Sequence, residues 1–351
     1  MCIRDSMYAA VIADYDKESS IEIHESIPVP EPKANQVLVR ITASSVNPID
    51  LMKKEGYGSP IFEKQRKIKF PWILGSDFSG HVVSQGNKVN KFKEGDEVWG
   101  CTSNASSGTF AEFVAIDQEE ISIKPRNLNF EEAASLPYVF LTTWSAVVRW
   151  AGLRPQDLEN RNIFIQGGAG GVGTTAIQLF KHWGCNVSTT CSKKNIDLLK
   201  SLGADKVIDY QKDKFYEILN DQDLVYDLLG DSVMDNSLDK CTLILKNLPS
   251  SHYIGLTHPF VSTIDNKGLF LGIPHALLMR QKLKSKHKPV NVHWSIYRPS
   301  LSGLQQLTNL AEDQIIKPVI DSIYSLSDIN NAYKKVATGH GSGKVVIKNK
   351  L

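Results

Sequence analysis

The chain has 351 residues, and because a single domain typically runs to ~100–200 residues, this length predicts two domains. Apolar residues make up 42% and charged residues 22%, and no apolar run approaches the ~18 residues that cross a bilayer, which argues against disorder and against an integral membrane segment. A net charge of +2 gives no general attraction to nucleic acid or anionic lipid. We expect a small-molecule partner and no nucleic acid, and we allow for a homodimer.

The cysteines are odd in number and widely spaced, and they include no C-x-x-C pair: Cys2, Cys101, Cys185, Cys191 and Cys241. This spacing favours neither a disulfide framework nor a zinc ribbon, and it fits a reducing compartment. Residues 1–6 are too short and too polar for a signal or transit peptide, and Met7 leads directly into a strand-like run. We therefore expect residues 1–6 to be a non-native leader and the protein to be cytoplasmic.

Residues 7–123 consist of short apolar runs broken by turn residues. Along one run Val37, Val39 and Ile41 recur at every second position, which is typical of a strand with one solvent-exposed face. The pattern predicts an antiparallel β domain. After Pro125 the apolar residues take a helical spacing, which predicts helix through Ala133, Leu136, Phe140, Trp144 and Val147.

From Asn162 onward strands alternate with helices, the first of which we expect at Thr174–Trp183. Repeats of this kind predict a parallel sheet covered by helices, so the second domain is of α/β type. Near the C-terminus we expect strands around residues 319–324 and 345–347 with a helix between them. Those strands have no local partner, and we expect them to return to the first domain.

A glycine-rich turn lies between the strand NIFIQ and the following helix, and it contains G-x-G-x-x-G at Gly168, Gly170 and Gly173. The turn follows a strand, precedes a helix and consists mainly of residues without side chains. Together these features predict a binding site for a pyrophosphate. The alternative is a glycine-rich turn without a ligand, which would not need so many glycines. The predicted cofactor contacts here are Gly168, Ala169, Gly170, Gly171 and Val172.

The end of the next strand predicts which nucleotide is preferred. A site for NAD normally has Asp or Glu about 20 residues beyond the glycines, to hold the ribose 2′-hydroxyl. Here Ser192, Lys193 and Lys194 follow the strand instead, and a hydroxyl beside ammonium groups suits a 2′-phosphate. We therefore predict NADPH as the cofactor, held by Ser192 and Lys193. The alternative interpretation is two solvated lysines at a helix start.

Several motifs together resemble those of the medium-chain dehydrogenase/reductase superfamily: SVNPIDLMKKEGYG (Ser45–Gly58), FPWILGSDFSGHV (Phe70–Val82), AASLPYVFLTTWSA, GGAGGVG and the closing GHGSGKVVI. The resemblance covers essentially Met7 to Leu351. It implies an α/β protein in which a GroES-like β domain accompanies a Rossmann domain with a doubly wound parallel sheet. The implied ranges are 7–135 for the catalytic domain, 136–298 for the Rossmann domain and 299–351 for the return to the catalytic domain.

Zinc alcohol dehydrogenases of this superfamily have Cys at the position of Asn47, and Gly-His-Glu at the position of Gly75-Ser76-Asp77. Asn47 and Ser76 offer neither thiolate nor imidazole, so we expect no metal.

The sequence resembles the zinc-free quinone oxidoreductase and enone reductase branch. Within that branch it is similar to the reticulon-interacting mitochondrial oxidoreductases, which share three short elements with it: Gly56–Gly58, Ser135–Tyr138 and Val292–Trp294. That group is imported into mitochondria, whereas here no amphipathic leader is seen.

The branch implies hydride delivery from NADPH to a quinone or an α,β-unsaturated carbonyl, a reaction in which hydrogen-bond donors stabilise the developing oxyanion. The candidate catalytic residues are Asn47, Tyr57 and Lys54. Asn47 has a structural alternative as a turn residue before Pro48, and Tyr57 has one as a packing aromatic. Asp50 is expected to be structural.

The resemblance also implies further cofactor contacts at Thr142, Tyr210, Leu229, Gly230, Thr257 and Lys344. A competing interpretation is a nucleotide-binding scaffold or interaction protein with little turnover, and a zinc alcohol dehydrogenase is disfavoured by Asn47 and Ser76. The basic run Arg280–Lys288 is expected to be a solvated face, with a membrane or partner surface as the alternative.

Overall fold

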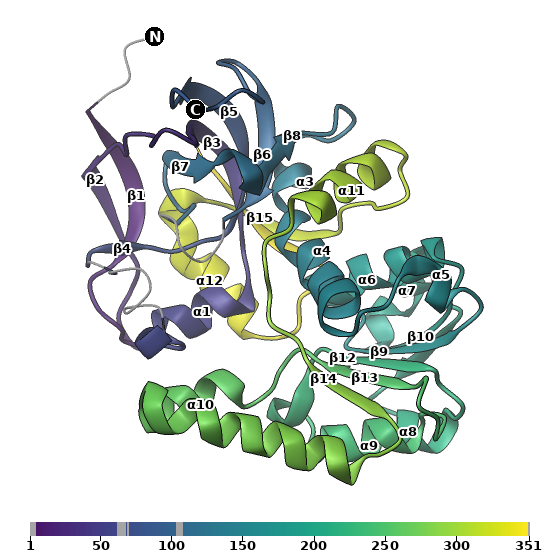
Figure 1. Cartoon of the computed structure of the whole chain (residues 1–351). Helices are drawn as coiled ribbons and strands as arrows, with labels where there is room; N and C mark the ends of the chain where they lie inside the picture. The colour runs from purple at the N-terminus through teal and green to yellow at the C-terminus, as the bar shows by residue number, and fades with distance from the viewer. Residues whose placement is uncertain (1–4, 62–67, 69, 103–107, 350–351) are drawn as a thin grey trace. The chain divides into compact units, whose positions relative to one another are not determined.

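The computed structural model describes residues 5–61, 68, 70–102 and 108–349, so Cys2 and residues 1–4 of the expected leader lie outside the described part. The chain divides into two compact units, coloured along the sequence in Figure 1. Unit 1 comprises Met1–Leu141, Pro299–Gln314 and Pro318–Leu351, and unit 2 comprises Thr142–Arg298 and Ile315–Lys317.

Unit 1 contains two sheets. Its strands are β1 (Ser6–Ile12), β2 (Glu22–Pro28), β3 (Gln36–Val46), β4 (Trp72–Ile73), β5 (Asp77–Gln85), β6 (Glu97–Cys101), β7 (Phe113–Asp117), β8 (Ile121–Ile123), β15 (Ile320–Ser325) and β16 (Lys344–Lys348). The larger sheet has the order β15-β16-β3-β5-β6-β8 with β7 also paired to β3, and the smaller has the order β2-β1-β4. The strands pair antiparallel, apart from the parallel pair β15 and β16.

The helices of unit 1 are α1 (Pro48–Lys54), α3 (Phe130–Ala134), α11 (Leu301–Glu312) and α12 (Ile329–Ala337), and α4 (Pro137–Trp144) begins in unit 1 and ends in unit 2. The helical spacing after Pro125 corresponds to α3, α4 and a π-helical turn at Ser145–Trp150. Ser135 and Leu136 interrupt this run, because a helix rarely continues through the residue that precedes a proline.

β3 is the central strand of unit 1, since it pairs with β5, β7 and β16. Val37, Val39 and Ile41 pack into a core on one side. We expected the other side to face solvent, and for β3 this is wrong. Helix α3 packs against β3 and β5, and Ser44 and Ser45 are fully buried. The polar end of this strand therefore lies inside the unit.

Unit 2 is a six-stranded parallel sheet of order β11-β10-β9-β12-β13-β14. Its strands are β9 (Asn162–Gln166), β10 (Asn186–Cys191), β11 (Lys206–Asp209), β12 (Leu224–Asp227), β13 (His252–Gly255) and β14 (Asn291–Trp294). Its helices are α5 (Pro155–Leu158), α6 (Gly171–His182), α7 (Ile196–Ser201), α8 (Phe215–Ile218), α9 (Ser237–Leu243) and α10 (Phe260–Lys286). Helices α6 and α7 cover one face of the sheet and α9 and α10 the other (Figure 1).

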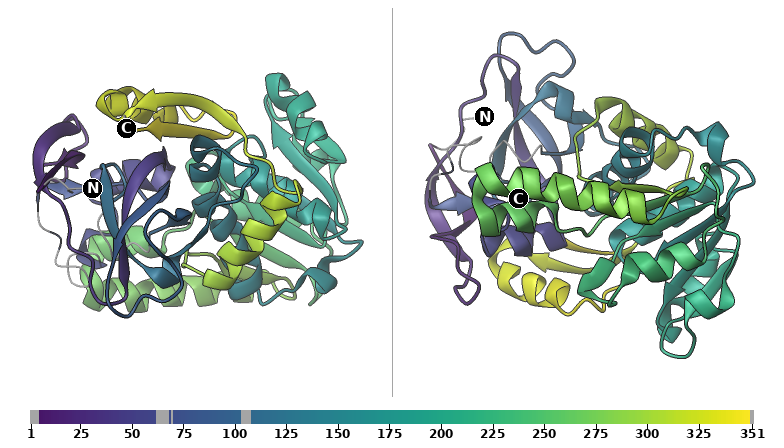
Figure 2. Two further views of the ribbon diagram at one scale, coloured as in Figure 1. Left: turned by 90° about the horizontal axis from the view of Figure 1, so that it is seen from above. Right: turned by 60° about the horizontal axis from the view of Figure 1, so that its bottom comes forward.

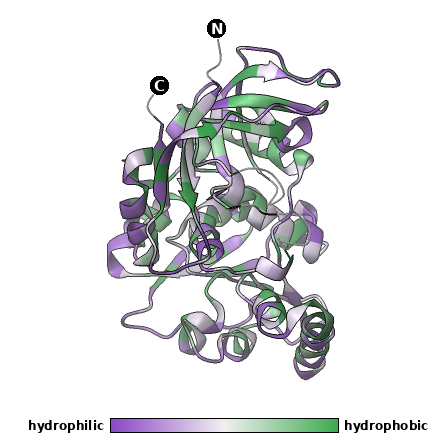
Figure 3. Ribbon diagram, turned by 90° about the vertical axis from the view of Figure 1, so that its left-hand side faces the viewer, coloured by the Kyte–Doolittle hydropathy of each residue, from purple (hydrophilic) through white to green (hydrophobic). Residues whose placement is uncertain are grey.

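The predicted fold class, a β domain with a doubly wound parallel-sheet domain, is confirmed. Hydrophobic residues concentrate along the strands, whereas the connecting loops are mainly hydrophilic (Figure 3). The helix expected at Thr174–Trp183 begins earlier, at Gly171. Helix α10 was not predicted, and a break at Gly268 (φ 71°) and the internal Pro274 account for the weak helical pattern. No helix of the described residues is long and apolar enough to cross a membrane.

The C-terminal strand β16 lies in the same sheet as β3, with Val345 opposite Val46, and Figure 2 shows the C-terminal segment in yellow beside strands of the first half. Gly343 precedes this strand with φ 88°, and a Cβ there would collide with the Val319 carbonyl oxygen. Glycine is therefore required at this position. The sharp entry places Lys344 beside the end of β3.

Candidate functional site

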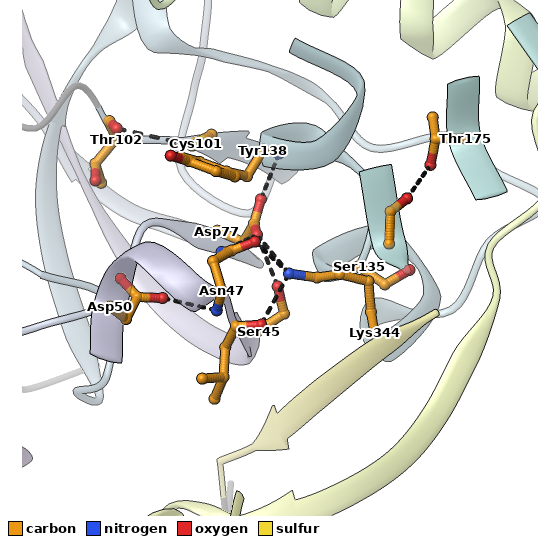
Figure 4. Close-up of polar contacts among 12 residues, drawn as sticks. Ser45, Asn47, Asp50, Asp77, Cys101, Thr102, Ser135, Tyr138, Thr175 and Lys344 are labelled. Atoms are coloured by element: carbon orange, nitrogen blue, oxygen red, sulfur yellow. Dashed lines mark hydrogen bonds and ion pairs between the residues drawn. The ribbon is translucent and has the colours of Figure 1, made fainter. Parts of the chain in front are cut away.

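A buried polar cluster lies in unit 1 where β3 ends and β5 and β16 begin (Figure 4). Its members Ser45, Asn47, Asp77 and Lys344 are at most 5% exposed. Asp77 Oδ2 accepts hydrogen bonds from Ser45 Oγ at 2.7 Å and from Asn47 Nδ2 at 2.9 Å. Lys344 Nζ donates to Asn47 Oδ1 at 2.5 Å and lies 3.5 Å from Asp77 Oδ2. One carboxylate thus connects three elements of the unit.

Backbone groups complete the cluster. Asp77 Oδ1 accepts a hydrogen bond from the Tyr138 amide at 2.6 Å, and Lys344 Nζ also donates to the Val46 carbonyl at 3.0 Å. Asp50 Oδ2 accepts from the Asn47 amide at 2.8 Å, which satisfies a donor at the start of α1. With the Tyr138 amide on Oδ1 and two side chains on Oδ2, both carboxylate oxygens of Asp77 accept hydrogen bonds. The expected structural role of Asp50 agrees with this capping contact.

Burial shapes the acid–base properties of the cluster. It lowers the pKa of Lys344, and the charges of Asp77 and Asp50 oppose that shift. Burial also raises the pKa of Asp50, and the positive charge of Lys53 opposes this shift. Burial, reinforced by Cys101 and Asp50, also holds the pKa of Tyr138 well above its usual value. The charged form of Lys344 therefore depends on its carboxylate neighbours.

The three predicted catalytic residues have different environments. Asn47 is 1% exposed, and its amide is held between Asp77 and Lys344. Lys54 Nζ donates to the carbonyl oxygens of Asp16 and Lys17, which ties the loop after β1 to the last turn of α1. The structure gives Lys54 structural partners outside the polar cluster, and the catalytic roles of Lys54 and Asn47 stay predictions.

Tyr57 is partly buried and lies between two glycines with left-handed backbone conformations, Gly56 (φ 87°) and Gly58 (φ 77°). Its amide donates to the Met52 carbonyl, so the turn continues directly from α1. The Tyr57 phenol contributes to the raised pKa of Tyr138, as one of several electrostatic influences. Its catalytic role also stays a prediction.

Sequence reasoning missed Asp77, Ser45 and Tyr138 as members of this cluster, and it assigned Lys344 only to the cofactor. Asp77 could have been recognised in the sequence, because it follows Gly75-Ser76 at the position where the zinc alcohol dehydrogenases have Glu. Ser76 Oγ and Asp50 Oδ1 are buried without a hydrogen-bond partner among the described residues. The pairing of Asp77 with a lysine 267 positions away has no local signal.

The glycine-rich turn connects β9 to α6 in unit 2, and each glycine has its own environment. A Cβ on Gly173 would lie 2.5 Å from the Gly167 carbonyl oxygen, and one on Gly168 would collide with Thr189 Oγ1. Gly170 differs, since its nearest neighbour would be 4.0 Å away. Gly168 and Gly173 therefore allow close packing of the turn, whereas Gly170 leaves open space at the helix N-terminus, beside Ala169, Gly171 and Val172.

The remaining predicted cofactor contacts of unit 2 mostly follow the carboxyl ends of its strands: Ser192 and Lys193 after β10, Tyr210 after β11, Leu229 and Gly230 after β12, and Thr257 after β13. Ligands of open parallel sheets bind at this edge, where the strand order reverses, here between β9 and β12. Thr142 is buried within α4, and Lys344 lies in the polar cluster of unit 1.

Comparisons with known proteins agree with this architecture. Residues 33–126 match the alcohol dehydrogenase GroES-like domain, and residues 202–347 match the zinc-binding dehydrogenase family. The chain is 34% identical over 358 residues to the mitochondrial NAD(P)H oxidoreductase RTN4IP1 of Danio rerio, covering 98% of this chain and 92% of that protein. The chain belongs to the quinone oxidoreductase branch of the medium-chain dehydrogenase/reductase superfamily. The predicted family is confirmed.

A second relative by sequence and one solved structure show the same similarity. The human protein named mitochondrial NAD(P)H oxidoreductase RTN4IP1 is 36% identical, over 97% of this chain and 89% of that protein. The solved quinone oxidoreductase from Coxiella burnetii superposes with a TM-score of 0.81 at 30% identity, covering 98% of this chain and 99% of that chain. The whole chain thus takes part in the family resemblance.

The two kinds of glycine in the turn predict different outcomes. Gly170→Ala should leave the melting temperature unchanged, since the new methyl group meets no atom closer than 4.0 Å, but it should weaken nucleotide binding by about tenfold, equivalent to about 1.4 kcal/mol. Gly173→Ala should lower the melting temperature, because its methyl group meets backbone. Calorimetric titration with NADPH and thermal unfolding test the pair, and equal effects of both variants on binding and stability would contradict it.

The buried ion pair predicts strong coupling. Lys344→Met and Asp77→Asn should each lower the free energy of unfolding by about 3–5 kcal/mol, because each leaves an uncompensated buried group, and the double variant should lose less than the sum. Lys335→Met is the control, since its pair with Asp321 is part-exposed and should change stability by less than about 1 kcal/mol. Urea unfolding measures all four variants. Additive losses at Lys344 and Asp77 would show that the pair contributes no coupling.

Proposed function

We propose that this protein is an NADPH-dependent oxidoreductase that transfers hydride to a quinone or an α,β-unsaturated carbonyl compound without a metal ion. The observation that carries the proposal is the Asn47–Asp77–Lys344 cluster, which occupies the region where metal-dependent relatives hold zinc. The printed names of the relatives, NAD(P)H oxidoreductases and a quinone oxidoreductase, support the reaction class.

The donor set of the cluster does not fit zinc. Structural and catalytic zinc sites use thiolate, imidazole and carboxylate ligands. Here an amide and a hydroxyl, Asn47 and Ser76, stand at two of the ligand positions, and the carboxylate of Asp77 is paired with Lys344. Among the described residues no group of three or more His, Cys, Asp or Glu side chains could hold a metal ion. The proposed reaction therefore takes no step through a metal.

The residues of unit 2 fit a dinucleotide. Gly170 and the first amides of α6 would receive the pyrophosphate, and Ser192 and the exposed Lys193 would bind a 2′-phosphate through charge-assisted hydrogen bonds. Asp227 Oδ1 accepts hydrogen bonds from the Leu229 and Gly230 amides, at 3.0 and 2.9 Å, and so fixes the loop after β12. When bound, the nicotinamide supplies the hydride.

The residues of unit 1 supply donors for the carbonyl oxygen on which negative charge develops. An Asn side-chain nitrogen carries two hydrogens, one of which Asn47 gives to Asp77, and we assign the second to the substrate oxygen. The Tyr57 hydroxyl is the second donor in this proposal. Lys344 acts as a positioning residue that holds the Asn47 carbonyl, and Lys54 supports the site through the loop that it binds.

Two finer assignments belong to the same proposal. The acceptor is a small molecule, and a homodimer remains part of our prediction. The word mitochondrial in the names of the relatives supports a mitochondrial location as the alternative to a cytoplasmic one.

NADPH should bind about tenfold more tightly than NADH, because a charge-assisted hydrogen bond contributes about 1.5–3 kcal/mol. Lys193→Ala should remove most of this preference and leave the affinity for NADH unchanged. Lys200→Ala, an exposed lysine on α7, is the matched control and should retain it. Fluorescence titration with both nucleotides measures the ratio, and equal dissociation constants in the unaltered protein would refute the assignment.

The reaction itself is tested by NADPH oxidation with a panel of quinones and enones. We expect turnover that survives chelation, and Tyr57→Phe should lower kcat roughly a hundredfold while NADPH affinity stays the same, since only an oxyanion donor is removed. Binding of NADPH without turnover on any acceptor would favour the scaffold function. Loss of activity on chelation, restored by added zinc, would show a metal enzyme. Full turnover of Tyr57→Phe would make Tyr57 a packing residue.

A further inference from the structure

Helix α10 carries an apolar surface that nothing in the described structure covers. The five side chains of this surface, which we call the α10 patch, are exposed to different degrees: Phe270 94%, Leu271 72%, Leu278 57%, Leu277 49% and Ile273 39%. A contiguous apolar patch exposed on a domain surface normally marks an interaction site. Within unit 2, α10 packs against β14, beside which it lies in Figure 1.

The geometry of α10 fixes which side is outside. The break at Gly268 divides the helix into two segments, and the second packs back on the first through small residues. Gly272 and Ala276 are buried, and a Cβ on Gly272 would lie 2.7 Å from Ile264 Cα. With about 3.6 residues per turn, Phe270 and Leu277 then lie on the side opposite this contact. The exposure of the α10 patch therefore follows from the packing of the helix.

The last turns of the same helix carry most of the basic run Arg280–Lys288, which ends just beyond the helix. The run contains Arg280, Lys282, Lys284, Lys286 and Lys288, and the one acidic residue of α10 is Asp265. Lys286 pairs with Asp239 on α9, and His287 contacts the same carboxylate, so the end of the helix is anchored. No carboxylate of the described residues forms an ion pair with the other four cations. Sequence analysis favoured a solvated face here, but a solvated face does not account for the apolar residues beside it.

We propose that α10 docks this protein onto the surface of an anionic lipid bilayer, lying in the interface with the α10 patch inserted and the basic run on the headgroups. An interfacial helix combines exposed Phe and Leu with a cluster of Lys and Arg, and the four cations that form no ion pair among the described residues suit an anionic surface. A second copy of the chain fits less well, because a symmetric contact centred on the α10 patch would pair the apolar residues alone and would leave the neighbouring cations of both copies without an anionic partner.

Vesicle flotation with the full chain tests the proposal without any turnover, so its outcome is independent of the proposed reaction. We expect flotation with phosphatidylcholine vesicles that contain phosphatidylserine, and much less with phosphatidylcholine alone. The double variant Phe270→Ser/Leu271→Ser should bind at least tenfold more weakly. Lys282→Glu/Lys284→Glu should lose the preference for anionic vesicles, by about fivefold or more for each lysine.

Leu243→Ser is the matched control, since Leu243 is an equally exposed leucine, 73%, on α9 and outside the basic run. It should float like the unaltered chain, and the melting temperatures of all variants should agree, with Phe270→Ser as a milder variant if the double one unfolds. Absence of binding to anionic vesicles, or equal binding by every variant, would overturn the proposal. A dimer that dissociates on Phe270→Ser, in a chain that ignores vesicles, would also overturn it and would make the patch a contact between copies.

Discussion

The ion pair between Lys344 and Asp77 is the constraint on which the structure of unit 1 depends. An ammonium and a carboxylate can be buried together only when hydrogen bonds satisfy their remaining donors and acceptors, and here Val46, Asn47, Ser45 and the backbone amide of residue 138 do so. The two charges come from residues 267 positions apart. The last strand must therefore join the sheet of the first half before either charge is compensated, which links the folding of the unit to the assembly of its site.

The same pair determines how Asn47 points. An ammonium group can only donate hydrogen bonds, and an ionised carboxylate can only accept them. The amide oxygen of Asn47 must then face Lys344 and its nitrogen must face Asp77, as the distances show. A residue that an isolated turn would leave free to rotate is held in one orientation. This is the kind of preorganisation that a metal-free oxyanion site requires. In the proposed reaction, the C-terminal strand contributes by holding Asn47 in this orientation through Lys344.

Local patterns were sufficient for some of these features. The glycine turn could be predicted because a strand, a tight turn and a helix are adjacent in sequence. The role of Gly173 follows from packing within that turn, whereas Gly168 packs against Thr189 of β10. The partners of Asp77 could not be predicted, because they arise from contacts between distant strands. Likewise, the alternation along β3 predicts one buried side, while the covering of its other side by α3 is a tertiary effect that periodicity cannot report.

Helix α10 shows a different limit of sequence reasoning. Phe270, Leu271 and Leu277 are residues that composition assigns to a core, and only the positions of Gly272 and Ala276 on the buried side reveal that they face outward. The net charge of +2 similarly averages over a chain whose cations are unevenly placed. Electrostatic attraction to a surface falls off within about 10 Å at moderate salt, so a bilayer responds to the local run on α10 rather than to the sum. For this reason a nearly neutral chain and a strongly basic docking helix are physically compatible.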